Sequence, residues 1–301
     1  MCSSVHDLCS LEERLMNCSV VSFSMEFTRE ESVRRLEETV SNDDPIIGAG
    51  AGTGMSAKFA ERGGVNLLII YNSGRYRMNG RGSLAGLLPY GDANEIVLDM
   101  GRQVLPVVED TPVLAGVNGT DPFRNMDVFV EDLKRRGFSG VQNFPTVGLI
   151  DEDSQFRQNL EETGMGYDEE VEMIREAAEQ GMLTCPYVFT EEQAREMTEA
   201  GADVIVSHMG LTTSGDIGAE TALDLDAAAE RVQAHHDAAK DVDEDVLVIC
   251  HGGPIAWPDD AEYVLNNTEG VVGFFGASSL ERLPTEEAIE NQASEFKSIE
   301  F

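Results

Sequence analysis

Eight short apolar runs recur along this chain, and segments with helical periodicity separate them. Continuous runs rich in Val and Ile are typical of parallel strands that are covered on both faces. Eight alternating strand and helix units predict an α/β fold, a (β/α)8 TIM barrel, with a doubly wound sheet as the alternative. The runs are "PIIGAG" from Pro45, "VNLLIIYN" from Val65, "PVLAGVN" from Pro112, "SGVQNFP" from Ser139, "LTCPYVF" from Leu183, "DVIVSHMG" from Asp203, "VLVICHGG" from Val246 and "VVGFFGAS" from Val271.

Several of the segments between the runs open on Thr, Asn or Asp and close on Gly, as capped helices do. Residues 28–40, "TREESVRRLEETV", predict an extra N-terminal helix at the bottom of the barrel. Residues 1–24 lack such periodicity, which predicts a disordered extension, so the true start is either Met1 or Met25. We therefore expect one barrel domain over residues 25–301.

The charge balance restricts the partners of the chain. Its 56 acidic and 21 basic residues give a net charge of −35, which predicts no nucleic-acid and no membrane partner. The acids are spread over predicted helix faces, a pattern that favours a halophilic protein in a cytosol of very high salt over an ordinary acidic protein. No secretory signal is visible at the N-terminus, so we expect a cytoplasmic protein.

Polar residues gather where the predicted strands end, and in TIM barrels this end carries the ligand site. His208 and His251 end neighbouring strands and are candidate catalytic residues, although a buried structural histidine is the alternative for each. Asn118 after the third run is a third catalytic candidate, and Asp121 is the only early carboxylate among these polar strand ends. The candidate substrate-binding residues at the same end are Asn72, Ser73, Gln142, Asn143, Gly252, Gly253, Ser278 and Ser279.

Arg75 and Arg77 lie in a segment after the second run that we expect to be a loop, and basic residues are rare in this chain. A guanidinium binds carboxylate or phosphate well, so these arginines predict a small anionic ligand; pairing with surface acids is the alternative. No lysine falls at a strand end, which argues against a Schiff-base cofactor. The stretch "IIGAGAGTGMSAKFA" matches neither the dinucleotide fingerprint nor the P-loop, so no nucleotide cofactor is expected.

Longer stretches of the chain resemble a known family. They are "IIGAGAGTGMSAKFAERGGVNLLIIYNSGRYRMNGRGSLAGLLPYGDAN", "GVNGTDPF", "GVQNFPTVGLID", "ETGMGYDEEVEMI", "SHMGLTT", "CHGGPIA" and "GFFGASSLERLP". Together they resemble the phosphoenolpyruvate hydrolase-like, or phosphonopyruvate hydrolase-like, TIM-barrel family over about residues 26–298. The chain is similar, too, to a barrel in the C-terminal part of a plant virus-resistance protein.

The resemblance implies an enzyme that acts on a small anionic oxo-acid, such as phosphonopyruvate or a phosphoenolpyruvate-like compound, by metal-assisted hydrolysis or lyase chemistry. Through the distantly similar phosphoenolpyruvate mutase and isocitrate lyase superfamily, it implies Mg²⁺ or Mn²⁺ on Asp121. This chain departs from that superfamily at Gln142 and Asn143, where an acidic pair is usual, and it lacks the cysteine-containing loop. A non-catalytic barrel that senses a ligand or binds a partner is the alternative, and a homo-oligomer is left open.

Overall fold

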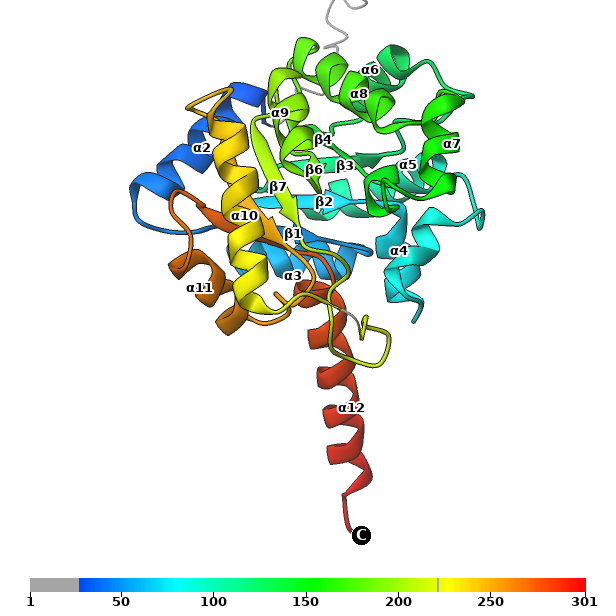
Figure 1. Ribbon diagram of the computed structural model, residues 1–301. Helices are drawn as coiled ribbons and strands as arrows, with labels where there is room; N and C mark the ends of the chain where they lie inside the picture. The colour runs from blue at the N-terminus through cyan, green and yellow to red at the C-terminus, as the bar shows by residue number, and fades with distance from the viewer. Residues whose placement is uncertain (1–26, 221) are drawn as a thin grey trace, which may run out of the picture.

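The computed structural model describes residues 27–220 and 222–301. Its strands are all parallel and form one sheet in the order β5-β4-β3-β2-β1-β9-β8-β7-β6 (Figure 1). The strands are β1 (Ile46–Gly50), β2 (Leu67–Ile70), β3 (Val113–Val117), β4 (Gly140–Asn143), β5 (Leu183–Thr184), β6 (Tyr187–Val188), β7 (Val204–His208), β8 (Leu247–His251) and β9 (Gly273–Gly276). Each of the eight apolar runs therefore contains a strand.

The two ends of this strand order belong to one segment of the chain. β5 pairs with β4 and β6 pairs with β7, and only Cys185 and Pro186 separate β5 from β6. The N–H of Cys185 donates to Val141, and the carbonyl of Pro186 accepts from the N–H of Val206. The fifth run thus closes the sheet into a ring, which confirms the predicted TIM barrel.

Helices follow the strands, and all but the last of them cover the outside of the ring (Figure 1). They are α3 (Gly54–Arg62), α4 (Asn72–Met78), α5 (Ala93–Val104), α6 (Met126–Arg135), α7 (Gln155–Glu162), α8 (Tyr167–Glu179), α9 (Glu191–Glu199), α10 (Leu225–Lys240), α11 (Pro258–Asn266) and α12 (Leu283–Lys297). Side chains of Thr53, Asp92, Thr190 and Asp224 accept a backbone N–H at the start of α3, α5, α9 and α10, so the predicted capping holds there.

The extra N-terminal helix is present as α2 (Arg29–Ser41). It contacts β1 and β5, which lie four places apart in the strand order, so it crosses the bottom of the barrel. Leu36 is buried there, and Nε of Arg29 lies 2.9 Å from Oδ1 of Asp203 at the entry to β7. This arrangement confirms the predicted position of the helix.

The segment after β2 differs from the prediction, because it is not a loop. Asn72 begins α4 directly after β2, and both Arg75 and Arg77 lie on this helix. A Cβ on Gly74 would stand 2.9 Å from Cα of Gly52, so the glycine lets the helix approach the turn after β1. The segment has no apolar periodicity, which is why its helix could not be predicted from pattern.

The predicted extension over residues 1–24 lies outside the described residues. Within 27–220 and 222–301, none of the helices has both the length and the apolar character needed to span a membrane.

Candidate active site at the mouth of the barrel

A cavity of about 160 Å³ opens at the C-terminal ends of the strands. Of the described residues that line it, none is an aspartate, glutamate, lysine or arginine. Its polar side chains are hydroxyls and imidazoles, and its remaining wall is aromatic or aliphatic. The lining side chains that concern the chemistry are Tyr71, Ser83, Phe144, Tyr187, His208, Thr212, His251 and Ser278.

The two histidines predicted to share a site do face each other. His208 ends β7 and His251 ends β8, and the two are paired in the parallel register. Their ring centroids are 4.6 Å apart, and each residue is 5% exposed. The structure therefore places both imidazoles, each almost fully buried, in the lining of one cavity.

Backbone partners assign a different tautomer to each neutral ring. The N–H of Gly210 donates to Nδ1 of His208 over 3.0 Å, so the proton of this imidazole lies on Nε2. Nδ1 of His251 lies 2.7 Å from the carbonyl oxygen of Phe275, so this nitrogen carries the proton and Nε2 keeps its lone pair. One ring can donate and the other can accept.

Burial keeps both rings uncharged at neutral pH. Desolvation lowers the pKa of His208 well below its ordinary value, and the neighbouring His251 lowers it further. Desolvation lowers the pKa of His251 to about 4, against the opposing effect of its hydrogen bond to Phe275. The pair is thus a neutral donor and a neutral acceptor.

Aromatic side chains support the pair from below. The Tyr187 ring lies 4.8 Å from the His208 ring and 5.0 Å from the His251 ring, measured between centroids. Its hydroxyl lies 3.5 Å from Nε2 of His251, at the outer limit of hydrogen bonding, and 3.4 Å from the hydroxyl of Tyr71. Burial raises the pKa of Tyr187 well above its ordinary value, so the phenol stays protonated.

The glycines after the histidines lock the two strand ends together. Gly252 and Gly253 have φ angles of 75° and 57°, in the left-handed region that favours glycine. The N–H of Gly253 donates to Gly210 over 2.8 Å, and a Cβ on Gly252 would lie 2.3 Å from the same carbonyl oxygen. The sequence "CHGG" therefore fixes its histidine against the "SHMG" turn, and neither glycine contributes a chemical group.

Neither predicted anion-binding arginine reaches the cavity. Nη2 of Arg75 lies 2.5 Å from Oδ2 of Asp99 on α5. Arg75 therefore pairs with a surface acid, which was the alternative to binding an anionic ligand. Arg77 is buried behind the wall, with its guanidinium 5.3 Å from the Tyr71 ring centroid and its Nη2 3.1 Å from Oε2 of Glu281. Glu281 also accepts hydrogen bonds from the N–H of Gly52 and the hydroxyl of Ser56, so the pair joins three strand ends.

Asn72 and Ser73 hold the rim of the cavity. Nδ2 of Asn72 donates to Gly86 over 2.8 Å, and the hydroxyl of Ser73 donates to Ser83 over 2.6 Å. These bonds position the short helix η1 (Ser83–Leu87), whose first residue lines the cavity. Asn72 and Ser73 thus position part of the cavity wall and do not line the cavity themselves.

The side-chain amides of Gln142 and Asn143 likewise form hydrogen bonds within the protein. Nε2 of Gln142 donates to Cys185 over 2.9 Å across the barrel interior. Asn143 faces outward, where it donates to Oε2 of Glu170 on α8 over 2.7 Å and accepts from the N–H of Tyr187 over 2.7 Å. Burial raises the pKa of Glu170 to about 7. The amides therefore position Tyr187 and its strand.

Asn118 and Asp121 lie beside the cavity and do not line it. The carboxylate of Asp121 accepts from Nδ2 of Asn94 over 3.1 Å and from Nε of Arg124 over 2.9 Å. The backbone N–H of Asn118 donates to Asn94 over 2.9 Å. Across the described part of the chain, no three His, Cys, Asp or Glu side chains gather as a metal would require. The metal role of Asp121 stays a prediction.

Of the predicted site residues, the structure brings His208, His251 and Ser278 together around the cavity. Ser279 faces a groove on the outside of the barrel. The pattern of polar strand ends did not single out Tyr71 or Phe144, which precede and follow predicted residues. Side chains alternate along a strand, and this alternation is the signal that could have found them.

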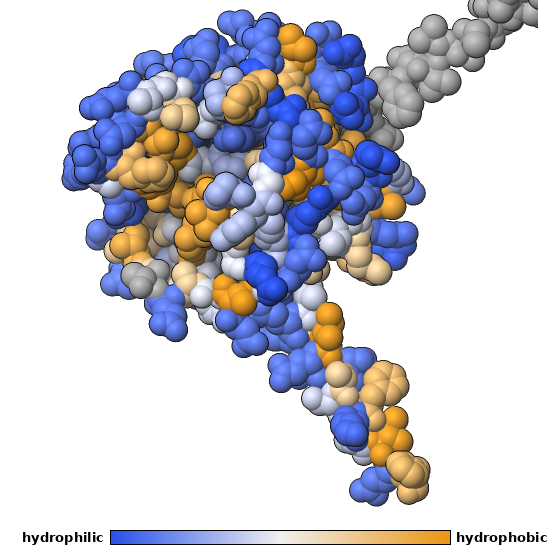
Figure 2. Space-filling model, turned by 90° about the vertical axis from the view of Figure 1, so that its right-hand side faces the viewer, coloured by the Kyte–Doolittle hydropathy of each residue, from blue (hydrophilic) through white to orange (hydrophobic). Residues whose placement is uncertain are grey.

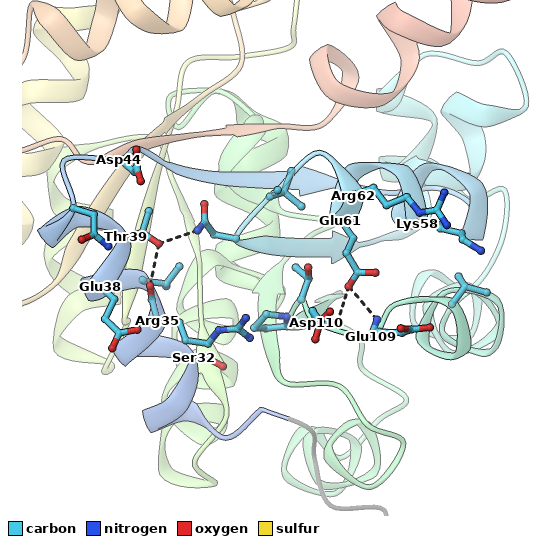
Figure 3. A pocket seen from close by; sticks show the side chains of 18 residues that line it. Ser32, Arg35, Glu38, Thr39, Asp44, Lys58, Glu61, Arg62, Glu109 and Asp110 are labelled. Atoms are coloured by element: carbon cyan, nitrogen blue, oxygen red, sulfur yellow. Dashed lines mark hydrogen bonds between the residues drawn. The ribbon is translucent and has the colours of Figure 1, made fainter.

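A larger cavity of about 660 Å³ lies at the opposite end of the barrel, between α2, α3 and the segment before β3 (Figure 3). Charged side chains of both signs line it, and Oε1 of Glu61 accepts from the N–H groups of Glu109 and Asp110 over 3.0 Å and 2.8 Å. TIM barrels place their chemistry at the other end. The smaller cavity at the mouth is therefore the candidate active site.

Comparisons with known proteins agree with this architecture. The phosphoenolpyruvate phosphomutase of Streptomyces platensis subsp. rosaceus has a similar fold, with a TM-score of 0.56 and 15% identity over 89% of this chain and 86% of that one. A phosphonopyruvate hydrolase, solved as a complex with oxalate and Mg²⁺, matches with a TM-score of 0.53 and 16% identity over 88% and 87% of the two chains.

Sequence relatives are much closer. The ToMV susceptible protein tm-1(GCR26) of Solanum lycopersicum is 60% identical over 267 residues, which is 89% of this chain and 35% of the tomato protein. The chain thus spans about a third of the length of that relative. The family described as phosphoenolpyruvate hydrolase-like matches residues 31–299, and the chain belongs to this family.

Proposed function

We propose that this chain is an enzyme that acts on a small oxo-acid in the mouth cavity, with His251 accepting a proton and His208 donating a hydrogen bond. The observation that carries the proposal is the pair of neutral imidazoles in opposite tautomers, 4.6 Å apart. A neutral imidazole with a free Nε2 lone pair can accept a proton, and a neutral Nε2–H can donate a hydrogen bond to an oxygen that gains negative charge. The family description and the names of the structural neighbours support a substrate such as phosphonopyruvate or phosphoenolpyruvate.

The two rings have distinct roles in this proposal. Nε2 of His251 has a lone pair and takes a proton from the substrate or from water. Nε2–H of His208, a residue that is 5% exposed, donates to the oxygen on which negative charge develops. The protonated hydroxyl of Tyr187 lies beside His251 and is a second donor.

The size and lining of the cavity limit the ligand. A cavity of about 160 Å³ is smaller than the roughly 300–1,000 Å³ of typical ligand pockets, so the substrate is small. With no charged side chain among the described lining, the hydroxyls of Ser83, Thr212 and Ser278 add to His208 and Tyr187 as donors to a carboxylate or phosphonate. We propose these three as substrate-binding residues.

The predicted Mg²⁺ or Mn²⁺ does not fit the donors that this chain offers at the mouth. Asp121 is engaged by Arg124 and Asn94, and no carboxylate among the described residues lines the cavity. The Mg²⁺ in the phosphonopyruvate hydrolase structure supports testing the ion. No step of the mechanism proposed for this chain depends on it.

Phosphate release from phosphonopyruvate and from phosphoenolpyruvate tests the proposal, in 2 M KCl with and without Mg²⁺ or Mn²⁺. We expect turnover that falls about 10² to 10⁴-fold in His208→Gln and in His251→Gln. Ser279→Ala, outside the cavity, is the matched control and should keep full activity. If neither compound releases phosphate between pH 6 and 9, the substrate is wrong; equal activity in the histidine variants and the control would refute the role of the pair.

The second candidate function is binding without turnover. The observation that favours it is the 60% identity to a tomato protein named for susceptibility to a virus, of which this chain covers 35%. A thermal shift caused by an oxo-acid that NMR then finds unchanged after a day would support this function. Consumption of the ligand would exclude it.

A further inference from the structure

The connection between β7 and α10 crosses the mouth of the barrel. It is long for a connection in this fold, and its residues 210–212 and 217–219 line the mouth cavity. On the far side, a Cβ on Gly82 would lie 3.9 Å from the carbonyl oxygen of Ile217. Gly82 belongs to the rim that follows β2 and α4, and β2 lies four places from β7 in the strand order. Residues 210–219, the mouth segment, therefore span the opening.

Hydrogen bonds near the cavity hold the two sides of the mouth segment. The N–H of Thr213 donates to the carbonyl of Gly253 over 3.1 Å, which ties the segment to the turn after β8. The N–H of Ala219 donates to the carbonyl of Thr212 over 3.2 Å, which ties its two sides to each other. Residues 214–216 form the tip beyond these bonds.

The first turn of α12 holds this tip from outside (Figure 1). Nη2 of Arg282 donates to the carbonyl of Ser214 over 2.9 Å, and Oε2 of Glu286 accepts from the N–H of Asp216 over 3.2 Å. Arg282 and Glu286 also pair with each other over 3.1 Å. Figure 2 shows the rest of α12 projecting from the barrel, so the contact with the tip belongs to its first turn.

The backbone of the tip depends on this contact. Ser214 has a φ angle of 70°, in the left-handed region that a residue with a side chain rarely adopts. Gly215 follows with a φ angle of 73°, and a Cβ there would lie 2.3 Å from both Nη1 of Arg282 and Oε2 of Glu286. Such a backbone conformation costs free energy and persists where surrounding contacts hold it. The tip is therefore ready to relax once its two bonds break.

We propose that the mouth segment is a lid over the candidate active site, and that Arg282 and Glu286 are the latch that keeps it closed. His208 and His251 are each 5% exposed under the closed lid, so a substrate reaches them when the latch releases the tip. Neither latch residue lines the cavity, so both are positioning residues. The inference rests on the proposed function only in taking the mouth as the site.

Chemical labelling of His251 tests the latch on the full chain, without substrate, in 2 M KCl at pH 7. Diethyl pyrocarbonate attacks the lone pair of a neutral imidazole, and Nε2 of His251 keeps this lone pair. Mass spectrometry of the peptides measures the rate. Glu286→Ala removes the acceptor of the tip and the partner of Arg282, so it should speed the labelling about tenfold. The matched control Glu287→Ala, an exposed acid at the next position, should react as slowly as the wild type.

His235 on α10 is the internal reference. It is 2% exposed, and its Nδ1 lies 2.7 Å from the hydroxyl of Ser207, away from the mouth. It should stay unlabelled in all three proteins. Labelling of His235 in step with His251 would show that Glu286 stabilises the whole barrel, and would overturn the proposal. Equal His251 rates in Glu286→Ala and Glu287→Ala would overturn it too. A chain that releases no phosphate from either oxo-acid still gives a full answer here, because no turnover is measured.

Hydrogen exchange resolved to single residues gives a second readout. The N–H groups of Thr213 and Ala219 bond to carbonyls that Glu286→Ala does not touch. Both should nevertheless exchange faster in this variant, because the whole segment moves. The N–H of Val206 in β7, bonded to Pro186, should keep its wild-type rate. Unchanged protection of Thr213 and Ala219 would mean that the tip alone loosens, and would refute the lid.

Discussion

The two ends of the barrel differ in the kind of side chain that they gather. The N-terminal cavity is wide and lined by charges of both signs, whereas the mouth cavity is small and has no charged side chain among its described lining (Figure 3). Arg77 and Glu281 are buried as a pair, and neither lines the mouth cavity. The candidate site is therefore neither the larger nor the more highly charged of the two cavities. It is the cavity in which a neutral hydrogen-bond donor and a neutral acceptor lie at neighbouring strand ends.

The first prediction concerns the charged exterior, and its expected effect is the largest. A net charge of −35 repels itself over about 30 Å at 0.01 M salt and over about 3 Å at 1 M. We expect dialysis from 2 M to 0.05 M KCl to remove most of the roughly 5–15 kcal/mol that stabilises a folded chain. The melting temperature, followed by circular dichroism, measures this. A melting temperature that stays constant would show that the stability of the chain does not depend on salt, as expected for an ordinary acidic protein.

The second prediction concerns the pair behind the mouth. Glu281→Leu leaves the buried charge of Arg77 without a partner, which should lower the free energy of unfolding by about 3–5 kcal/mol. Urea unfolding in 2 M KCl measures the loss. The double variant Arg77→Met, Glu281→Leu is the control and should recover much of it, because no charge remains buried. Equal losses in the single and double variants would mean that shape, and not charge, sets the effect.

The third prediction concerns pH and the mouth. The pKa of His251 is about 4 in the folded chain and about 6.5 when unfolded, so the unfolded chain binds the proton first as pH falls. This destabilises the fold below about pH 6.5, by about 2 kcal/mol at pH 5. His235, with a pKa of about 4, acts in the same direction. Glu170, with a pKa raised to about 7, acts oppositely, because its contribution is lost as pH rises from about 4.5 to 7.

Comparison of wild type with His251→Asn separates these contributions. The difference between the free energies of unfolding at pH 7 and pH 5 should be about 2 kcal/mol smaller in the variant, since the other groups are common to both. An identical pH dependence in the two proteins would show that His251 is not held neutral.

The fourth and smallest effect belongs to the N-terminal cavity. Lys58 is an exposed side chain on its wall, so Lys58→Gln should change the free energy of unfolding by less than about 0.5 kcal/mol and leave ligand binding unchanged. Isothermal titration with the substrate identified for the mouth checks the second part. Weaker binding would indicate that the ligand binds at the N-terminal end of the strands, and would contradict the assignment of the site to the mouth.

The strands and the pairing of His208 with His251 could be predicted, because unbroken apolar runs and their polar ends are local signals. The partners of the polar residues could not. Arg77 meets Glu281 from 204 positions away, and Asn143 turns outward to Glu170 on a later helix. Sequence spacing does not encode which polar group a buried side chain finds, and for this reason the predicted anion and metal residues proved to be engaged by the protein itself.

The mouth of the barrel holds two neutral imidazoles in opposite tautomers. Long-range ¹H–¹⁵N NMR of histidine-labelled protein in 2 M KCl tests it directly, with His208→Asn and His251→Asn to assign the signals. The account predicts that, at pH 7, Nδ1 is protonated in His251 and Nε2 in His208, with both rings uncharged down to about pH 5. A charged ring at pH 7, or the same tautomer in both rings, would contradict it.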